Sequence, residues 1–406
     1  MHIHVAYMII FLYLCAIFWY LYSCASTRTD NKEENNEKNN SMKKQFTRLH
    51  FLVATMMTLS IALGVLSSCK PGNPPEDEKP ICIIYDTDIG SSTDDLFALK
   101  LLYYAADQGF VRLLGATVCR QDSAGNWEPY VKLADLMNTY YGYPNLPLGV
   151  ERNGVRKPHA YIPYTGIAQM KNADSTLMFK RTISNYSTLP DGYKLHRKLL
   201  AQQPDGETSI LAIGFMSTVA HLLESEGDEY SPLNGVELVS KKVKALYVMA
   251  GKFGEDGNLS PGYNFGHNAD ALAFTRTVLN KWPKNIPIYI SPSPVGDEVE
   301  YPKDEVLRDI DWTDAEPIKQ TYLNYNVATG QMMWDLLSAM EATEHHFTDL
   351  CEHSEPGFVI LNDNNELIFT PDPAGNCRYQ VLPEGKEETI VSAFKDAMHE
   401  ITKYHR

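Results

Sequence analysis

The stretch ICIIYDTDIGSSTDDLFALKLLYYAAD, residues 81–107, decides the fold of this chain. Its first five residues, 81–85, form a continuous apolar run, which is typical of a strand buried on both faces. Residues 94–107 then repeat apolar residues at helical spacing, with two acids in the first turn, where the helix dipole favours them. A buried strand followed directly by a helix predicts the first unit of a parallel α/β sheet.

Downstream of this unit the chain keeps alternating between strand-like and helical stretches. Strands are expected at 111–119, 209–214, 244–251 and 286–291, with helices at 130–142, 217–225 and 268–280. The segment FVILNDNNELIFT (358–370) predicts a hairpin near the C-terminus. We therefore expect residues 81–406 to form one α/β domain, built on an open, largely parallel (mixed) Rossmann-like sheet flanked by helices.

The composition allows a large core and argues against nucleic acid as a partner. Of the 406 residues 44% are hydrophobic, and 36 Lys and Arg stand against 51 Asp and Glu, for a net charge of −15. The basic residues form no stripe interleaved with aromatic residues, and neutralising phosphates requires clustered Lys and Arg. We therefore expect no nucleic-acid partner.

The seven cysteines give no sign of a zinc centre. They are widely spaced and include no CxxC pair. Cys82 and Cys119 lie in apolar strand-like runs and are interpreted as buried small hydrophobic residues. A disulfide between Cys351 and Cys377 stays open as an alternative, because an oxidising compartment would permit it.

The N-terminal part carries features of export. Residues 5–22 are an uncharged run that is long enough to span a bilayer. A second signal follows, in which Met42-Lys43-Lys44 provides positive charge and residues 51–65 are apolar. It ends in Leu66-Ser67-Ser68-Cys69, which resembles a bacterial lipobox, where cleavage occurs before a cysteine that becomes lipid-modified.

These features predict how the N-terminal part is divided. Residues 1–41 are interpreted as a spurious extension, 42–69 as a lipoprotein signal peptide with Cys69 as the lipidated residue, and 70–80 as a flexible tether. Lys70, rather than Asp, follows the cysteine and favours the outer membrane. The expected location is the periplasm or cell surface of a Gram-negative bacterium, with a lipid anchor as the only membrane contact. A transmembrane hairpin is the alternative.

Four carboxylates follow the first buried strand within ten residues: Asp86, Asp88, Asp94 and Asp95. Ligand sites of open α/β sheets lie at the carboxyl ends of the strands, which is where these residues fall. So many like charges repel one another unless a cation neutralises them, and a hard divalent ion such as Ca²⁺ prefers carboxylate oxygens. The cluster therefore predicts a metal site with catalytic carboxylates.

Two other interpretations of the cluster stay open. In the first, Asp94 and Asp95 cap the helix and the other two acids lie in a solvated loop, although capping needs only one acid. In the second, Asp86 and Asp88 belong to a phosphatase of the haloacid-dehalogenase type, which also places DxD after its first strand. Such phosphatases normally continue with Thr or Val, whereas Ile89-Gly90 follows here.

The same stretch resembles the inosine–uridine-preferring nucleoside hydrolase family, whose hallmark is a DxDxGxDD loop after the first strand. The resemblance spans roughly residues 80–385. Further segments that resemble the family are LAIGFMSTVAHLL (211–223), MAGKFGEDGNLSPGYNFGHNADA (249–271) and GQMMWDLLSAM (330–340). One departure is that two additional residues separate Asp88 from Asp94, so the loop must bulge or reach further.

The resemblance implies a Ca²⁺-dependent ribohydrolase that cleaves nucleosides, or a related ribosyl compound, to ribose and free base. The implied Ca²⁺ ligands are Asp88, Asp95, Asp335 and the backbone carbonyl of Ile213. Asp88 is also the implied general base on a water that the ion binds, and several carboxylates would stabilise an oxocarbenium-like transition state. Asp86 is expected to orient the ligands. The implied substrate contacts are Asp94, Gln121, Met249, Asn258, Asn264, Trp334 and Asp335.

Three positions depart from the family pattern. Gly262 stands where a Glu usually contacts the ribose 5′ end, and Gln121, or alternatively Asp122, aligns with the Asn that follows the second strand. Trp334 replaces a His that is associated with protonating the leaving base, and it can either stack on a base or pack in the core. Other candidate acids, each of which can also be structural, are His159, Tyr161, Tyr164 and His267.

Two functions of other classes stay as alternatives to the hydrolase. A surface lipoprotein that binds nucleosides or sugars would keep the metal and the contacts to the ribose diol without turnover. A DxD-type phosphatase would depend on Asp86 and Mg²⁺. The resemblance also implies a small-molecule nucleoside-like substrate and a homodimer or homotetramer, and it leaves the base and the sugar unspecified.

Overall fold

The computed structural model describes residues 79–90, 92–157, 164–253, 259–325, 329–344 and 351–404. All of these belong to the unit that spans residues 73–406. The extension, the signal peptide with Cys69 and most of the tether predicted from the sequence lie outside the described residues. Among the helices that the structure describes, none is long and apolar enough to cross a membrane.

A ten-stranded sheet forms the centre of this unit, in the order β13-β12-β14-β8-β5-β4-β1-β2-β3, with β11 paired to β14. Its parallel part consists of β1 (Ile81–Thr87), β2 (Val111–Asp122), β3 (Leu148–Lys157), β4 (Thr208–Ala212), β5 (Val243–Met249), β8 (Ile288–Ser291) and β14 (Cys377–Val381). Its antiparallel part consists of β11 (Glu352–His353), β12 (Gly357–Leu361) and β13 (Leu367–Pro371). Two small sheets pair β6 (Lys252–Phe253) with β7 (Leu259–Ser260), and β9 (Glu300–Pro302) with β10 (Gly330–Met332). The predicted mixed, mostly parallel sheet is confirmed.

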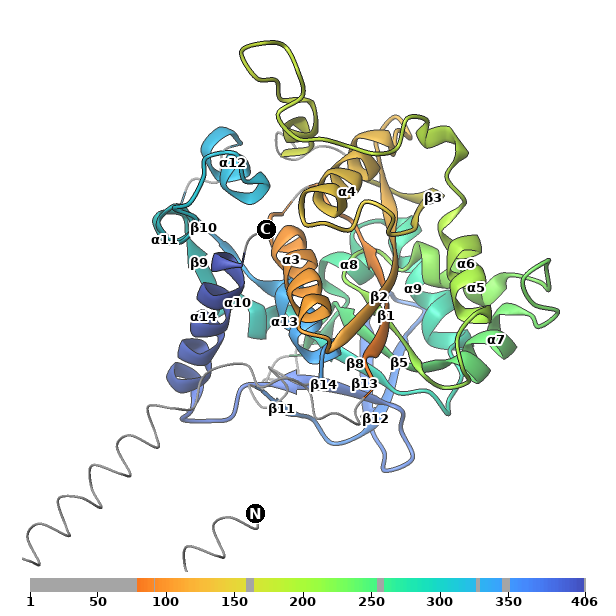
Figure 1. The fold of residues 1–406 in the computed structure, drawn as a ribbon. Coiled ribbons are helices and arrows are strands. Elements are labelled where there is room, and N and C mark those ends of the chain that lie inside the picture. The colour runs from red at the N-terminus through yellow and green to blue at the C-terminus, as the bar shows by residue number, and fades with distance from the viewer. Residues whose placement is uncertain are drawn as a thin grey trace, which may run out of the picture. The chain divides into compact units, whose positions relative to one another are not determined.

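Helices cover both faces of the sheet (Figure 1). One face carries α5 (Gly192–Ala201), α6 (Ser217–Glu224), α7 (Gly235–Lys242) and α9 (Ala269–Lys281). The other face carries α3 (Asp94–Asp107), α4 (Glu128–Tyr140) and α13 (Trp334–Ala342), and α14 (Glu387–Lys403) packs against α3. The shorter helical segments are α8 (Gly262–Gly266), α10 (Ser293–Asp297), α11 (Lys303–Asp309), α12 (Pro317–Asn324), and the 3-10 helices η1 (Tyr164–Gln169) and η2 (Tyr186–Thr188).

The central position of β1 explains its continuous apolar run. The whole strand is buried, and its side chains alternate between the two cores, with Ile83 and Tyr85 in one and Ile84 in the other. The helix that follows begins and ends at the predicted residues. β2 extends beyond the predicted 111–119, because its residues 120–122 continue to pair with β3. The polar side chains of Arg120 and Gln121 are buried there and find hydrogen-bond partners.

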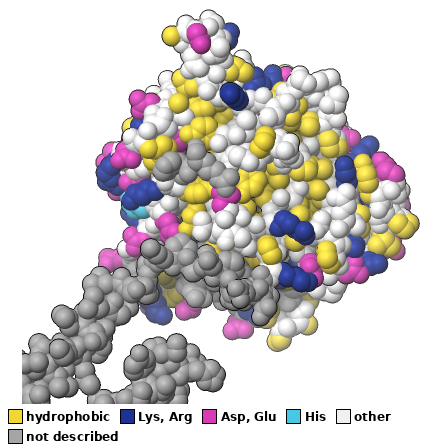
Figure 2. Space-filling view, in the orientation of Figure 1, with side chains coloured by type: hydrophobic (Ala, Val, Ile, Leu, Met, Phe, Trp, Pro, Cys, Tyr) yellow, Lys and Arg dark blue, Asp and Glu magenta, His cyan; other side chains and the backbone are white. Residues whose placement is uncertain are grey.

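The C-terminal hairpin is confirmed, since β12 and β13 pair antiparallel around a turn at residues 362–365. Cys82 and Cys119 are buried, as expected. Cys351 and Cys377 are free thiols, so the disulfide left open by the sequence is not formed. On the face seen in Figure 2, basic and acidic side chains are interspersed rather than gathered by sign.

Candidate active site

Three carboxylates from two distant parts of the chain meet beyond the carboxyl end of β1. Asp94 and Asp95 begin α3, and Asp335 lies in the first turn of α13, a helix that packs against α3. One carboxylate oxygen from each residue lies within 4.8 Å of the others. A single ion can be bound by all three at this spacing.

These carboxylates are buried to a degree that is costly without a counter-charge. Asp94, Asp95 and Asp335 are only 1%, 0% and 4% exposed. Burial raises the pKa of Asp94 to about 6. Burial together with the neighbouring carboxylates raises the pKa of Asp95 and that of Asp335 well above the usual range of an aspartate. Each of these carboxyl groups is therefore harder to ionise than an exposed aspartate until a cation offsets its charge.

The hydrogen bonds of these side chains leave oxygens for a ligand. Asp94 Oδ2 accepts from the backbone N–H of Asp335 at 3.0 Å, and Asp95 Oδ1 accepts from Thr87 Oγ1. Asp94 Oδ1 and Asp95 Oδ2 are buried and have no hydrogen-bond partner among the residues described. A hard divalent cation fits this set, because carboxylate oxygens are its preferred ligands.

Asp88 follows β1 at the same edge, and two basic side chains approach it. Asp88 Oδ2 lies 3.8 Å from Lys157 Nζ, and the Asp88 backbone carbonyl accepts from Arg120 Nη1 at 3.5 Å. All three residues are buried. Neither cation was predicted from the sequence. The sequence signal that could have pointed to them is a basic residue at the end of a strand-like stretch. Such a residue, once buried, requires a partner for its charge.

Three further predicted residues come together where β4, β5 and α8 meet. Asn264 Nδ2 donates to the backbone carbonyls of Ile213 at 2.8 Å and Met249 at 2.9 Å. The Ile213 N–H donates to the carbonyl of Asp86 at 2.9 Å, which ties the end of β4 to β1. A Cβ on the next residue, Gly214, would lie 2.5 Å from the backbone nitrogen of Asp88. The close approach of the two loops therefore requires glycine.

The longer loop between Asp88 and Asp94 is held by two tyrosines from distant elements. The Tyr164 hydroxyl, in η1, accepts from the N–H of Gly90 at 3.0 Å and donates to the carbonyl of Ser92 at 2.6 Å. The Tyr322 hydroxyl, in α12, lies 3.0 Å from Thr93 Oγ1. Gly90 has a φ of +121°, which a residue with a side chain rarely adopts. The described residues of this loop, 89–90 and 92–93, are thus held by contacts from outside the loop.

Asp86 belongs to a neighbouring polar network between β1, β2 and α5. Its Oδ1 accepts from Thr117 Oγ1, and this hydroxyl lies 3.0 Å from His196 Nε2. Burial raises the pKa of Asp86 to about 8 and lowers the pKa of His196 to about 3. Asp86 therefore lies beside the close group of Asp94, Asp95 and Asp335 and is not a member of it.

Gln121 and Trp334 use their polar atoms for contacts with other parts of the protein. Gln121 Nε2 donates to the backbone carbonyls of Arg152 and Gly154 in β3. Trp334 Nε1 donates to Asp297 Oδ1 at 2.7 Å. The indole N–H of Trp334 is therefore engaged at the junction of α13 with α10.

An aromatic group lies near Asp88 and Lys157. The ring of His267 lies 4.7 Å from that of Tyr263 and 5.8 Å from that of Phe215, measured between centroids. Lys157 Nζ lies 4.5 Å from the Tyr263 ring centroid. Of the other residues considered from the sequence, Asn258, His159 and Tyr161 lie outside the described residues.

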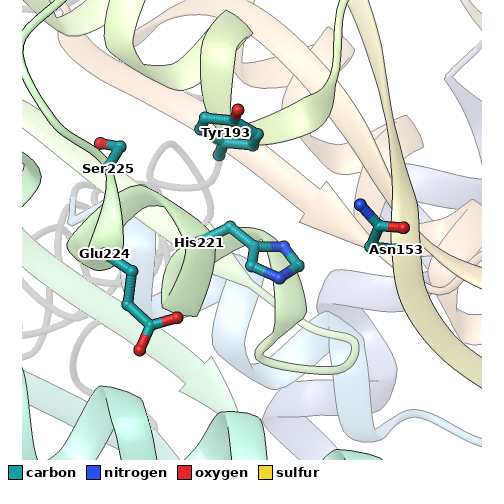
Figure 3. Close-up of a pocket in the computed structure, with 5 residues that line it drawn as sticks. All are labelled: Asn153, Tyr193, His221, Glu224 and Ser225. Carbon is teal, nitrogen blue, oxygen red and sulfur yellow. The ribbon is translucent and has the colours of Figure 1, made fainter.

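A separate small pocket opens on the flank formed by α5 and α6 (Figure 3). It is lined by Asn153, Tyr193, His221, Glu224 and Ser225, none of which was predicted for the site. His221 Nδ1 lies 3.1 Å from Glu151 Oε1, and the hydrogen bond to this carboxylate raises the pKa of His221. None of the carboxylate residues described above lines this pocket.

The profile of the family described as inosine-uridine preferring nucleoside hydrolase matches residues 83–385, which is more than half of the chain. A search of curated proteins found no match.

Solved structures of nucleoside hydrolases share the fold. The inosine-uridine preferring nucleoside hydrolase from Bacillus anthracis is similar with a TM-score of 0.53 and 14% identity, over 80% of this chain and 99% of that one. The purine-preferring ribonucleoside hydrolase from Gardnerella vaginalis has a TM-score of 0.55 and 13% identity, over 79% and 99%. A plant nucleoside hydrolase has a TM-score of 0.53 and 13% identity, over 79% and 99%.

Proposed function

The chain belongs to the inosine–uridine preferring nucleoside hydrolase family and is therefore a hydrolase of N-glycosyl bonds, and on this premise we propose that it cleaves ribonucleosides, or a related ribosyl compound, to ribose and free base with the help of Ca²⁺. The observation that carries the proposal is the buried group of Asp94, Asp95 and Asp335, whose oxygens lie within 4.8 Å of one another.

The proposed ligands of the ion are Asp88, Asp95, Asp335 and the Ile213 carbonyl. The buried oxygen of Asp95 that lacks a hydrogen-bond partner among the described residues supports this choice, as does the closeness of Asp95 to Asp335. Asp94 belongs to the same close group, so it is a candidate ligand as well as a candidate sugar contact. When bound, Ca²⁺ would act as a Lewis acid that acidifies a water molecule and attracts sugar hydroxyls.

Asp88 is the proposed general base. Cleavage of an N-glycosidic bond builds positive charge on the ribosyl ring, and the attacking water must lose a proton. Asp88 directly follows β1, at the edge of the sheet where α3 with Asp94 and Asp95 also begins, and this supports its proposed role as the acceptor of that proton. The negative charge gathered in this site would stabilise the oxocarbenium-like transition state.

Asp94, Asn264 and Asp335 are proposed to bind the ribose diol. The hydrogen bonds from Asn264 Nδ2 to two backbone carbonyls hold the amide in one orientation. Its oxygen is then set to accept from a sugar hydroxyl. Met249, whose carbonyl is one of these partners, is proposed to lie against the sugar.

The leaving base is proposed to lie beside Tyr263 and His267. Tyr263 is 42% exposed, so it offers an aromatic surface at the edge of the site. The indole N–H of Trp334 already donates to Asp297, so we assign Trp334 a stacking or packing role and no proton transfer.

A panel of nucleosides, read by release of the free base in Ca²⁺, tests the activity. We expect release from at least one nucleoside, and a loss of kcat of about 10²–10⁴-fold in Asp88→Ala, the range that a general base contributes. Asp363→Ala, at an exposed position in the C-terminal hairpin, is the matched control and should keep full activity. Full activity in Asp88→Ala would contradict the assignment, and nucleoside binding without any base release would favour the binding lipoprotein.

Removal of the ion tests the metal. Treatment with a chelator should abolish base release, and addition of Ca²⁺ should restore it. Activity that survives chelation would contradict the proposed role of Ca²⁺.

We also propose that the protein is exported and anchored through a lipid on Cys69. The lipobox-like Leu66-Ser67-Ser68-Cys69 after an apolar stretch supports this. Mass spectrometry of the mature N-terminus should find a lipid-modified Cys69. An unmodified chain that starts at Met1 would contradict the lipid anchor.

A further inference from the structure

A buried lysine reaches the carboxylate site from the edge of the sheet. Lys157 is the last residue of β3, which pairs with β2, and β2 in turn pairs with β1. Two strand spacings amount to about 10 Å. The Lys157 side chain nevertheless ends 3.8 Å from Asp88 Oδ2, so it extends across the end of β2 toward the loop that follows β1.

The ammonium group is held in place by its surroundings. The side chains of Lys157 and Asp88 are only 8% and 7% exposed. Lys157 Nζ also lies 4.5 Å from the centroid of the Tyr263 ring, a distance at which a cation is attracted to the face of an aromatic ring. This position is thus built into the protein and does not depend on a flexible surface side chain.

The Lys157 charge lies beside a residue that is proposed both to bind the metal and to act as the general base. Lys157 Nζ is 3.8 Å from Asp88 Oδ2. A fixed positive charge at this distance stabilises the carboxylates and repels a divalent cation that binds them.

We infer that Lys157 is a built-in counter-cation of the carboxylate site, which holds Asp88 in position and sets the affinity of the site for a divalent metal ion. The inference rests on the proposed function, because it presupposes that these carboxylates bind Ca²⁺. Its consequence is that part of the negative charge is already neutralised before the ion binds. The ion is then bound less tightly than the number of carboxylates alone would predict.

Calorimetric titration of the chelated protein with Ca²⁺ tests the inference without a substrate. Lys157→Met removes the charge and keeps the apolar stem, so we expect its Ca²⁺ dissociation constant to fall by at least about tenfold, since a repulsion between close charges is lost. Lys157→Arg keeps the charge and should bind Ca²⁺ as the wild type does. Lys180→Met, at an exposed position, is the matched control and should leave the dissociation constant unchanged.

Thermal unfolding provides a second readout. In chelator, Lys157→Met should unfold at a lower temperature than the wild type, because Asp88 loses its counter-charge. Addition of Ca²⁺ should then raise its unfolding temperature more than it raises that of the wild type, because a tighter ligand stabilises more. Should Lys157→Met fail to fold, Lys157→Gln carries the same two measurements.

The outcomes separate this inference from the proposed function. A wild type that binds no Ca²⁺ would overturn both. If the wild type binds Ca²⁺ and Lys157→Met binds it equally well or more weakly, the role of Lys157 is overturned and the metal site is left intact.

Discussion

Asp335 is 241 residues from Asp94 in the sequence, and its backbone N–H donates to the Asp94 carboxylate. Its own side chain lies in the group of buried carboxylates. A residue in this position carries two opposite effects. Its charge destabilises the metal-free protein, because like charges gather in a buried site, and its oxygens supply the ligands that a metal needs.

We expect Asp335→Asn to stabilise the metal-free protein by about 0.5–2 kcal/mol, the range that a single stabilising substitution commonly gives, because it removes an unfavourable charge from the site. The same change should remove the stabilisation that Ca²⁺ gives to the wild type. Urea unfolding in chelator and then in Ca²⁺ measures both effects. Asp363→Asn serves as the control and should resemble the wild type. A variant that is less stable than the wild type in chelator, or that is still stabilised by Ca²⁺, would contradict this prediction.

At the scale of elements, the loop between Asp88 and Asp94 depends on η1 and α12. Tyr164 bonds two backbone groups of the loop, and Tyr322 contacts the residue before Asp94. The two ends of this loop carry the proposed base and a proposed sugar contact. Tyr164 and Tyr322 therefore maintain the distance between Asp88 and Asp94, although neither tyrosine is the proposed base or the proposed sugar contact.

Tyr164→Phe tests this dependence. Without the hydroxyl, the N–H of Gly90 and the carbonyl of Ser92 lose their hydrogen-bond partner. We expect this loss to lower the free energy of unfolding by about 1–3 kcal/mol. KM should rise more than kcat falls, because Asp94 at the end of the loop contacts the sugar. Tyr230→Phe, at a tyrosine that is 40% exposed, is the control. Unchanged KM and stability in Tyr164→Phe would show that the loop holds its shape alone.

A second contact between elements fixes α5 to the connection between α6 and α7. Arg197, which is 1% exposed, donates through Nε and Nη2 to the two carboxylate oxygens of Asp228 at 2.6 and 3.0 Å. It also donates to the carbonyls of Ser231 and Leu233. The hydrogen bond from this guanidinium lowers the pKa of Asp228 below its usual value.

The lowered pKa makes the contribution of Asp228 to stability dependent on pH. An aspartate in the unfolded chain has a pKa of about 3.9. Because the folded-state pKa lies below this value, the stabilisation is complete above about pH 4 and is lost as the pH falls through the folded-state pKa. Asp228→Asn should therefore cost about 1 kcal/mol at pH 7, the scale of an ion pair that solvent reaches, and much less near pH 2. Urea unfolding at several pH values checks this, and an equal cost at pH 7 and pH 2 would contradict it.

At the scale of the whole molecule, a buried ion pair joins three distant segments. Lys100 in α3 lies 3.4 Å from Glu316 at the start of α12 and donates to the carbonyl of Thr402 in α14 at 2.9 Å. Both charged side chains are fully buried, and Tyr141 donates to the same Glu316 carboxylate. The helix that begins with Asp94 and Asp95 is thus bound to the C-terminal helix and to α12.

Lys100→Met should destabilise the protein by about 3–5 kcal/mol, because it leaves the Glu316 charge buried without its partner. The double variant Lys100→Met/Glu316→Gln removes the isolated charge and should recover part of the loss. Urea unfolding of both variants, with Lys180→Met as the exposed control, measures the difference. A double variant that is no more stable than Lys100→Met would show that the charge is not the cause.

The sequence by itself determined the fold class, the family and the position of the first carboxylates. The apolar run of β1 and the helical spacing of α3 are local patterns, which reflect burial within a few residues of each other. The cluster of Asp86, Asp88, Asp94 and Asp95 is equally local, so its place at the end of the first strand could be predicted directly. The assignment of Asp335 required the resemblance to a family, because nothing near it in the chain points to Asp94.

Only the tertiary structure decided which side chains meet. It brought Lys157 to Asp88 across β2, placed Tyr164 on the loop that carries two additional residues, and joined Trp334 to Asp297. These contacts connect residues that lie tens to hundreds of positions apart, and spacing along a chain contains no information about direction or distance across a sheet. The positions of Asp86, Asp88, Asp94 and Asp95 follow from a local pattern in the sequence. The cation beside Asp88 and the side chains that hold the loop depend on how the strands and helices pack.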